Sequence, residues 1–450
     1  MPLVQLELRV LFRFLRIGAL AFLVVGGLSC SRDDILRPDT PDIIDPEALD
    51  NRQGAPAIYA GAISDLVFAS TGSDRGVVVF SGLFTDEFMH AGTTPEIREW
   101  DLRAVRPTSG VTAGTVASHG TFLLLHRART ALESGARALS TLLPANDKRV
   151  GELWALAGMT YILFGENYCS GTPFSERDPT NELGSPLTTA EMLDRAVERL
   201  NTAAASSSGD ATVDNLIAVL RGRALLNAGR FPEATQAVVN VPTAYVYRFL
   251  HTAPPGRQLN QIFLLNTAGS TFSVPDREGT NGLNFASAAD PRLPVSPPRV
   301  SPSDGITPLV NFLRYTSVAD PVPMATGIEA RLIEAEAALR NGNTTEWLAK
   351  LNGARATVVG LSPLSDPGSS AQRVDLTFRE RAFWLFLTGH RLGDLRRLVR
   401  QYGRPAESVY PTGAYHKLGL TRGGQLTLIV PQPEENNPNY TAADCAVTSP

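Results

Sequence analysis

Cysteine is scarce in this chain, which has three in 450 residues. The cysteines form no paired metal pattern, and the six histidines contain no HExxH motif, so there is no familiar zinc site. Phosphate loops of the GxxxxGKS/T type, the GxGxxG turn and the GxSxG nucleophile motif are also missing. These absences argue against nucleotide-dependent enzymes, zinc hydrolases and serine hydrolases, and no cofactor is expected.

A strong charge of one sign is missing as well. The chain has 41 basic and 45 acidic side chains, a formal net charge of −4, which does not indicate a nucleic-acid partner. Hydrophobic residues make up 43% of the chain and charged residues 19%, the usual balance of a globular protein with a sizeable core. At this length we expect one large domain or two modest ones.

Long hydrophobic runs are limited to the N-terminus. The segment Ile17–Leu28 is apolar but only twelve residues long, whereas a transmembrane helix needs about 20 residues. Arg9, Arg13 and Arg16 precede it and provide the basic flank of an export signal. We therefore predict a signal peptide over residues 1–29.

The hydrophobic segment is followed by a cysteine. A small residue, Ser29, directly before Cys30 resembles the lipobox of bacterial lipoproteins, in which the cysteine becomes the lipidated first residue. Ser31 follows it in place of aspartate, which favours the outer membrane. The polar residues 30–50, rich in Pro and Asp, are then an extended tether. The alternative is an ordinary cleaved signal with an incidental cysteine.

Two further cysteines remain, Cys169 and Cys445. Outside the cytoplasm thiols oxidise, so we predict a disulfide between them. This bond would attach the C-terminal tail to the body of the protein. The alternative is a pair of buried free thiols.

Amphipathic helices dominate the rest of the chain. Capping residues at Thr188, Asn343 and Thr377, each followed three positions later by a glutamate, predict three helix starts. Short helices joined by turns such as "NAGRF" and "RNGNT", with Pro232 in the first turn of one helix, are typical of tetratricopeptide-like hairpins. Their spacing is irregular, so a regular solenoid is not expected.

Loop-rich insertions lie between these helices. Residues 66–115 contain the strand-like segment "GVVVFSG", and residues 240–325 are rich in Pro and turn residues. Long irregular loops on a rigid helical frame are where binding sites usually lie.

Seven segments, in order, resemble motifs of the SusD/RagB family of outer-membrane nutrient-uptake lipoproteins. The segment "FRERAFWLFLTGHRLGDLRRL", Phe378–Leu398, is similar to the family's Glu-Arg…Gly-His-Arg…Asp-Leu-Arg-Arg signature, with Thr388 where glutamate is usual. The other six are "LFTDEF", "VGELWALAGMTYILFGENYCSGTPFSE", "RGRALLNAGRFPEATQAV", "SAADPRLP" with its Asp-Pro-Arg, "ARLIEAEAALRNGN" followed by "LNGARA", and "LIVPQPEENNPN".

This resemblance implies a mainly α fold, SusD-like, with irregular tetratricopeptide-like hairpins and a ligand-binding domain over residues 51–450. It implies a lipid anchor in the outer membrane, facing the cell surface, and a SusC-like TonB-dependent transporter as partner, over which the protein acts as a lid. The ligand would be an oligosaccharide, glycopeptide or peptide, and the protein would not be an enzyme. Two alternatives are a helical-repeat lipoprotein for envelope assembly and a periplasm-facing lipoprotein enzyme.

Sugar binding requires aromatic platforms on which a pyranose face stacks. Trp154, Trp347 and Trp384 lie on apolar helix faces and are expected in the core. Trp100 lies in the first insertion, a region that supplies the ligand platform in some members of the resembling family. We therefore predict Trp100 and, in the second insertion, Tyr315 as ligand-binding residues.

The polar residues of "FLTGHRLGDLRRL" invite a catalytic interpretation, but their spacing favours a structural one. Asp394 lies three residues from both Arg391 and Arg397 on a predicted helix, so it is able to pair with either. His390 lies at the helix junction, where its ring can bond a free carbonyl. We predict that His390, Arg391, Asp394 and Arg397 form a polar clasp between two helices. The ligand site is then expected in the loops.

Overall fold

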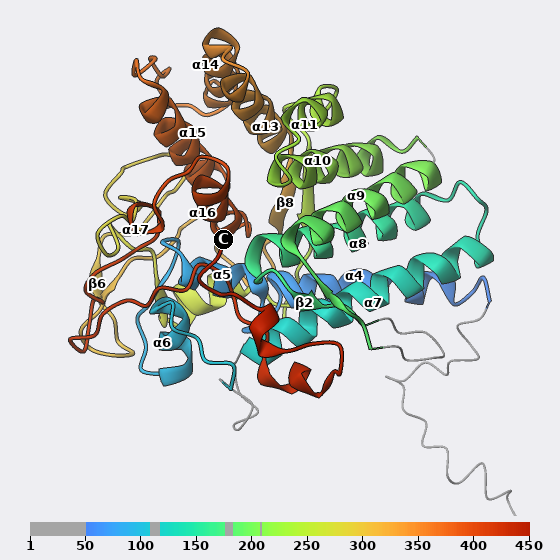
Figure 1. The fold of residues 1–450 in the computed structure, drawn as a ribbon, viewed down its shortest axis with the longest axis horizontal. Coiled ribbons are helices and arrows are strands. Elements are labelled where there is room, and N and C mark those ends of the chain that lie inside the picture. Colours follow the sequence, from blue (N-terminus) through green and yellow to red (C-terminus); the bar gives the residue numbers. More distant parts are fainter. Residues whose placement is uncertain (1–50, 109–117, 176–182, 208) are drawn as a thin grey trace, which may run out of the picture. The chain divides into compact units, whose positions relative to one another are not determined.

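Helices are the main regular structure in the computed structural model, which describes residues 51–108, 118–175, 183–207 and 209–450 (Figure 1). The predicted signal peptide, Cys30 and the tether lie outside the described residues. The α-helices are α4 (Ala55–Ser70), α5 (Val77–Phe84), α6 (Pro95–Asp101), α7 (Ser118–Leu142), α8 (Lys148–Asn167), α9 (Thr189–Ser206), α10 (Ala211–Asn227), α11 (Phe231–Val238), α12 (Gln261–Phe263), α13 (Gly327–Arg340), α14 (Thr344–Arg355), α15 (Ser370–Trp384), α16 (Arg391–Arg400) and α17 (Ala406–Val409).

The strands are short and pair two by two, all antiparallel. β1 (Met89–His90) pairs with β5 (Phe272–Ser273), and β2 (Thr172–Pro173) pairs with β3 (Pro186–Leu187). β4 (Val246–Phe249) pairs with β8 (Val322–Thr326), and β6 (Arg299–Val300) pairs with β7 (Pro308–Leu309). A π-helical turn, Leu264–Ala268, and two 3₁₀ turns, Gln432–Asn436 and Ala442–Asp444, complete the described elements. No helix within the described ranges is long and apolar enough to cross a bilayer.

Helical hairpins form the frame, as predicted. α8 packs on α9, α10 on α11 and α13 on α14, and these pairs follow one another through space in chain order (Figure 1). The predicted capping box at Thr188 is present, Asn343 caps α14 through the amide of Glu346, and Pro232 lies in the first turn of α11. Each cap satisfies amide groups that the first helical turn leaves without a partner.

The predicted helix start at Thr377 is wrong. α15 begins seven residues earlier, with a capping box formed by Ser369 and Gln372. Thr377 is buried inside the helix, where its hydroxyl accepts a hydrogen bond of 2.8 Å from the Trp347 indole and donates one of 2.7 Å to the carbonyl of Arg373. A Thr followed by Glu three residues later also occurs inside helices, and here the true cap lies upstream.

The segment "GVVVFSG" is a helix and not the predicted strand. All eight residues of α5, Val77–Phe84, are buried. β-branched residues favour strands only weakly, and a fully apolar helix suits a position that is enclosed on every side. Packing has therefore overridden local propensity.

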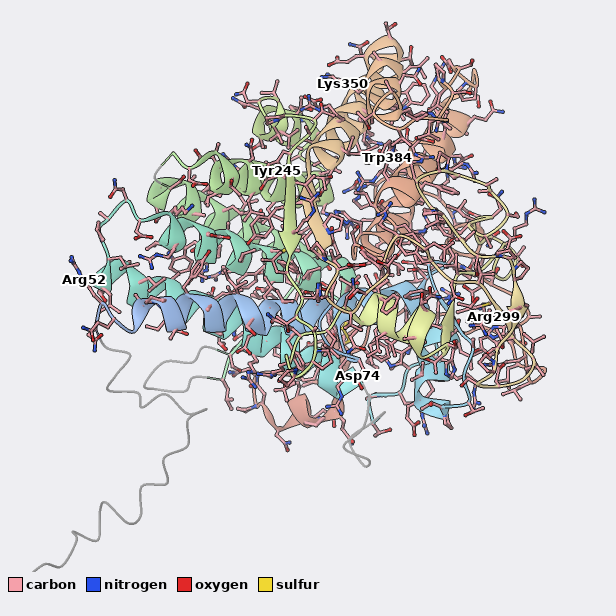
Figure 2. All side chains as sticks on the ribbon, turned by 180° about the vertical axis from the view of Figure 1, so that it is seen from behind. Arg52, Asp74, Tyr245, Arg299, Lys350 and Trp384 are labelled. Atoms are coloured by element: carbon pink, nitrogen blue, oxygen red, sulfur yellow. A yellow bond between two sulfur atoms is a disulfide. The ribbon has the colours of Figure 1, made fainter. Side chains whose placement is uncertain are left out.

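The second insertion is loop-rich, as predicted, and most of the protein's short strands lie in it. Figure 2 shows that Arg299 on β6, in the second insertion, lies well away from Lys350 on the α13–α14 hairpin. Trp347 is fully buried in the second, smaller apolar cluster, which residues of α13 and α14 form together with Leu385. Trp154 and Trp384 are partly buried and pack against the apolar clusters. The prediction that these three rings serve packing is confirmed.

The disulfide between Cys169 and Cys445 is present. Cys169 follows α8 and is completely buried, whereas Cys445 lies in the C-terminal tail. The tail is also attached by the amide of Leu426, which donates to the carbonyl of Val447 at 2.7 Å. The predicted attachment of the C-terminal tail is confirmed.

A buried carboxyl group lies just after α5. Glu87 is 1% exposed, and its Oε1 accepts a hydrogen bond of 2.8 Å from the amide of Leu387. Burial raises the pKa of Glu87 to about 8, although the Leu387 amide and the charge of Arg391 favour the ionised form. At neutral pH the group is therefore largely protonated in the folded protein and ionised in the unfolded chain.

We expect Glu87 to make the protein less stable as the pH rises from its ordinary pKa of 4.5 to about 8, because over this range only the folded state retains the proton. Glu87→Gln keeps the acceptor for Leu387 and removes this loss, which amounts to a few kcal/mol, about 1.4 per pKa unit. Urea unfolding of both proteins at about pH 5 and about pH 8 measures the effect. An advantage of the variant that does not grow with pH would contradict a neutral Glu87.

Candidate functional site

A cavity of about 690 Å³ lies among the loops of the second insertion and the segment 414–422. This volume is within the range of small-molecule sites, about 300–1,000 Å³. Met89, Val274, Pro298, Pro308 and Val310 form apolar walls. This cavity lies in the loops, where the sequence predicted the ligand site.

Short strand pairs hold these walls in place. Val310 accepts a hydrogen bond of 3.0 Å from the amide of Val274, and the Ser273 hydroxyl donates to the carbonyl of Pro308 at 2.7 Å. Met89 is fixed opposite Ser273 by the β1–β5 pairing. Backbone pairing therefore connects the first insertion to the second, and the apolar side chains between them line the cavity.

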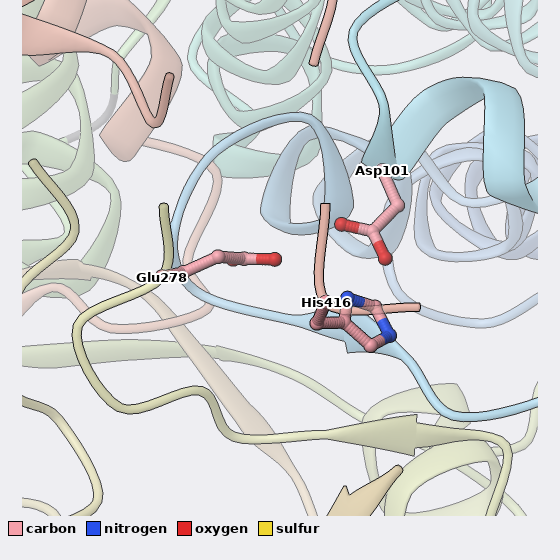
Figure 3. Close-up of side chains that lie close together, drawn as sticks. All are labelled: Asp101, Glu278 and His416. Carbon is pink, nitrogen blue, oxygen red and sulfur yellow. The ribbon is translucent and has the colours of Figure 1, made fainter. Parts of the chain in front are cut away.

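A cluster of polar side chains from three distant segments lies beside the cavity, which Glu278 and His416 line. Figure 3 shows Asp101, Glu278 and His416 close to one another, and ligand atoms from the three side chains lie within 4.8 Å. The Arg422 guanidinium bonds to Glu278 and to the carbonyl of Asp101, and it lies 3.5 Å from the Asp101 carboxylate. Asp101 also accepts hydrogen bonds of 2.8 Å from the Tyr415 hydroxyl and 2.6 Å from the His90 amide.

The pKa values of the Asp101 and Glu278 carboxyl groups are shifted in opposite directions. Burial opposes the ionisation of Asp101, but the charge of Arg422 and its other partners outweigh burial and lower its pKa. For Glu278, burial and the charge of Asp101 raise the pKa well above its usual value despite Arg422. One carboxylate and one guanidinium therefore neutralise each other, and Glu278 is the protonated partner.

Asp101, Glu278 and His416 have the donor types of a metal site, but Arg422 makes the site unsuitable. Its guanidinium contacts both carboxyl groups, so a divalent cation would lie beside a fixed positive charge. We assign these carboxyl groups to Arg422 and not to a metal.

Exposed polar side chains surround the opening of the cavity. Asp276, Arg277 and His416 line it and are exposed to solvent. Asp276 accepts a hydrogen bond of 2.9 Å from the amide of Ser287, which orients its carboxylate. The site therefore combines apolar walls with a carboxylate, a guanidinium and an imidazole, groups that bind hydroxyls and amides.

Trp100 and Tyr315 do not form an exposed platform, contrary to our prediction. Trp100 is 1% exposed, and its ring lies 4.5 Å from that of Phe80, measured between centroids. Tyr315 is 4% exposed and packs edge-on against Phe312, at 5.6 Å. Both faces are covered by the protein itself, so in this structure the two residues anchor loops and neither can stack on a sugar.

The structure places His390, Arg391, Asp394 and Arg397 in a buried ionic network at the start of α16. His390 contacts Glu329 of α13, with 2.9 Å between the ring Nε2 and the carboxylate. Arg397 donates to Asp394 at 2.8 Å and to Glu336 of α13. These contacts connect α16 to α13.

Arg391 does not pair with Asp394, although their spacing on the helix would allow it. It donates two hydrogen bonds, of 2.6 and 2.8 Å, to Asp86 after α5. Asp394 instead receives two from Arg381 of α15, at 2.8 and 2.9 Å. The network thus joins four helical segments. Its members are buried, and none of them is among the residues that line the loop cavity.

Sequence reasoning did not identify Glu278, Arg422 or Tyr415 as a group. Glu278 lies more than a hundred residues before Tyr415 and Arg422, and none of the three belongs to a recognisable motif. The only available indication was their position in Pro- and Gly-rich loops, which favours a site but does not name its residues.

No protein-family model matches the chain, and no curated protein matches it. Solved structures do. A SusD superfamily protein from Bacteroides vulgatus is similar with a TM-score of 0.63 at 16% identity, over 87% of this chain and 99% of the other. A SusD superfamily protein from Bacteroides thetaiotaomicron has a TM-score of 0.61 at 13% identity, over 87% and 99%.

A third structure, described as a SusD-like carbohydrate binding protein from Bacteroides vulgatus, has a TM-score of 0.56 at 12% identity, over 77% of this chain and 83% of the other. The chain therefore has a SusD-like fold, as the sequence motifs predicted. At these identities the likeness establishes the fold, and the ligand must be argued from the cavity.

Proposed function

We propose that this protein is a carbohydrate-binding lipoprotein of the outer membrane and that the cavity of about 690 Å³ holds its ligand. The observation that supports this most directly is the combination of apolar walls with exposed Asp276, Arg277 and His416 at the opening. A sugar ring presents apolar C–H faces and a rim of hydroxyls, and the cavity offers partners for both. One of the similar structures is described as a carbohydrate binding protein.

The finer part of the proposal is delivery to a transporter. The protein would be attached to the outer membrane through lipidated Cys30, face the cell surface and act as a lid on a SusC-like TonB-dependent transporter. The SusD-like fold and the lipobox-like sequence before Cys30 support this proposal. Purification of the tagged protein from its native membranes is expected to bring down a large β-barrel protein. A Cys30→Ala variant is expected to be absent from the membrane fraction.

We expect Ala414→Trp to abolish binding on a glycan array. Ala414 is exposed and lines the cavity, so an indole there blocks the opening. Arg277→Asn is expected to weaken binding about tenfold or more, because hydrogen bonds from charged groups contribute about 1.5–3 kcal/mol. Asparagine suits this position because Arg277 has a positive φ of 54°.

The matched control is Ala253→Trp, at an exposed loop position that does not line the cavity. It should bind as the wild-type protein does. Equal binding by Ala414→Trp and wild type would show that the ligand lies elsewhere. An array on which the wild-type protein binds no glycan would contradict carbohydrate as the ligand class.

A further inference from the structure

A second cavity, of about 330 Å³, lies between α15, α16 and α17, and the loop 276–283 contributes to both cavities. Three arginines line the second one: Arg379 of α15, Arg391 of α16 and Arg404. Three further lining residues, Asn281, Asp375 and Ser408, are polar. The apolar walls consist of Leu283, Phe378, Leu395, Leu398 and Val409. Positive charge and apolar surface therefore meet in one concave site.

Two of these arginines already have counter-ions. Arg391 is bound by both oxygens of Asp86. Arg404 donates to Asp375 at 2.7 Å and to the carbonyl of Ala371 at 3.0 Å. Neither guanidinium therefore leaves a positive charge without a partner.

Arg379 has no carboxylate partner among the described residues. Its one hydrogen bond within them is from Nη1 to the amide oxygen of Asn284, at 2.9 Å, and its guanidinium lies 4.7 Å from the centre of the Phe383 ring. Neither contact neutralises its charge. Arg379 is half-buried, and a half-buried cation without a counter-ion is unfavourable.

The neighbouring carboxylates are already used by other arginines. Glu380 receives hydrogen bonds of 2.7 Å from both Arg292 and Arg355, and Asp290 binds Arg292. Glu380 and Asp290 thus balance Arg292 and Arg355 in charge, just as Asp86 balances Arg391 and Asp375 balances Arg404. Burial lowers the pKa of Arg379; the charges of Glu380 and Asp290 oppose this shift, and those of Arg292 and Arg355 add to it. An arginine nevertheless remains charged, so one positive charge is left over.

We propose that this cavity binds the carboxylate of a small organic acid with an apolar body, held by Arg379. One unpaired guanidinium matches one carboxylate in charge, and its planar donors match two oxygens in geometry. The five apolar walls contact the hydrocarbon part of the ligand. A sulfate or phosphate would bring a second charge with no partner against those walls. This site is separate from the carbohydrate cavity and does not depend on the function proposed for it.

Isothermal titration calorimetry of the full chain with hexanoate tests this proposal. Hexanoate is expected to bind one site, whereas hexanamide, which has the same body without the charge, and inorganic sulfate are not. In Arg379→Gln the affinity for hexanoate should fall at least about tenfold. In Arg379→Lys, which keeps the charge but loses the planar guanidinium that can donate two parallel hydrogen bonds, an intermediate loss is expected.

The matched control is Arg373→Gln on the same helix. Arg373 is paired with Asp366 through two hydrogen bonds of 2.8 Å and does not line the cavity, so hexanoate binding should persist. Thermal melting checks that each variant folds. The proposal is overturned if the wild-type protein does not bind millimolar hexanoate, if Arg379→Gln binds it equally well, or if Arg373→Gln loses it to the same extent. Tighter binding of sulfate than of hexanoate would overturn the apolar-body ligand.

Discussion

Asp394→Ala is expected to lower the free energy of unfolding by about 3–5 kcal/mol, the usual result of removing one partner from a buried charge network. Asp394 is 3% exposed and accepts hydrogen bonds from Arg381 and Arg397, both of which are buried. Without it, Glu336 is the remaining carboxylate in contact with both guanidinium groups, at 3.8 Å from Arg381. Two cations would then share one counter-ion inside the protein.

Urea denaturation at neutral pH measures this loss, and Asp366→Ala is the control. Asp366 forms a two-bond pair with Arg373 of the same kind, but at the surface. Exposed pairs contribute about 0–1 kcal/mol, so the control should be almost as stable as wild type. Because Asp394 does not line the loop cavity, Asp394→Ala should retain ligand binding while it is folded. An unchanged melting temperature with lost binding would contradict a structural role.

The same variant also has an expected pH dependence. Burial opposes the ionisation of Asp394, but the charges of Arg381 and Arg397 outweigh burial and lower its pKa below its usual range. Its stabilising contribution is therefore complete above the unfolded pKa, about 3.9, and decreases as the pH falls below that value. The difference in unfolding free energy between wild type and Asp394→Ala should shrink in acid.

Removal of the disulfide is expected to have an effect of similar size. Cys169→Ser with Cys445→Ser should lower the free energy of unfolding by about 2–5 kcal/mol. The bond closes a loop of 276 residues and so reduces the conformational entropy of the unfolded chain. Guanidinium denaturation of the oxidised wild type and the double variant gives the difference. A reducing agent should bring the wild type to the level of the variant and leave the variant unchanged. Equal stability with and without reducing agent would show that the bond contributes nothing.

The helical frame and the disulfide could be predicted because their determinants are local or few. Helix caps such as Thr188 involve residues three positions apart, and two cysteines allow one pairing. The start of α15 was misplaced because Thr377 has the same local pattern as a cap. Only tertiary contacts, here the Trp347 indole, show that it lies inside the helix.

The candidate site was predictable only as a region. Whether Trp100 is exposed depends on Phe80, which lies in a helix that local propensity assigned to a strand. The contact of Arg422 with Asp101 joins segments that are unrelated in sequence pattern. One sequence gives residue types and periodicity, whereas burial and long-range charge pairing require the folded chain.

The long-range ion pairs also bear on the order in which the protein folds. Arg391 and Asp86 are 305 residues apart, and Arg422 and Asp101 are 321 apart. During synthesis, the first helices are complete long before their cationic partners exist, so Asp86 and Asp101 cannot yet be enclosed without a cost in solvation. Contacts between residues so far apart in the sequence make folding slow. We expect the early segment to remain open to chaperones and proteases until the last quarter of the chain joins it.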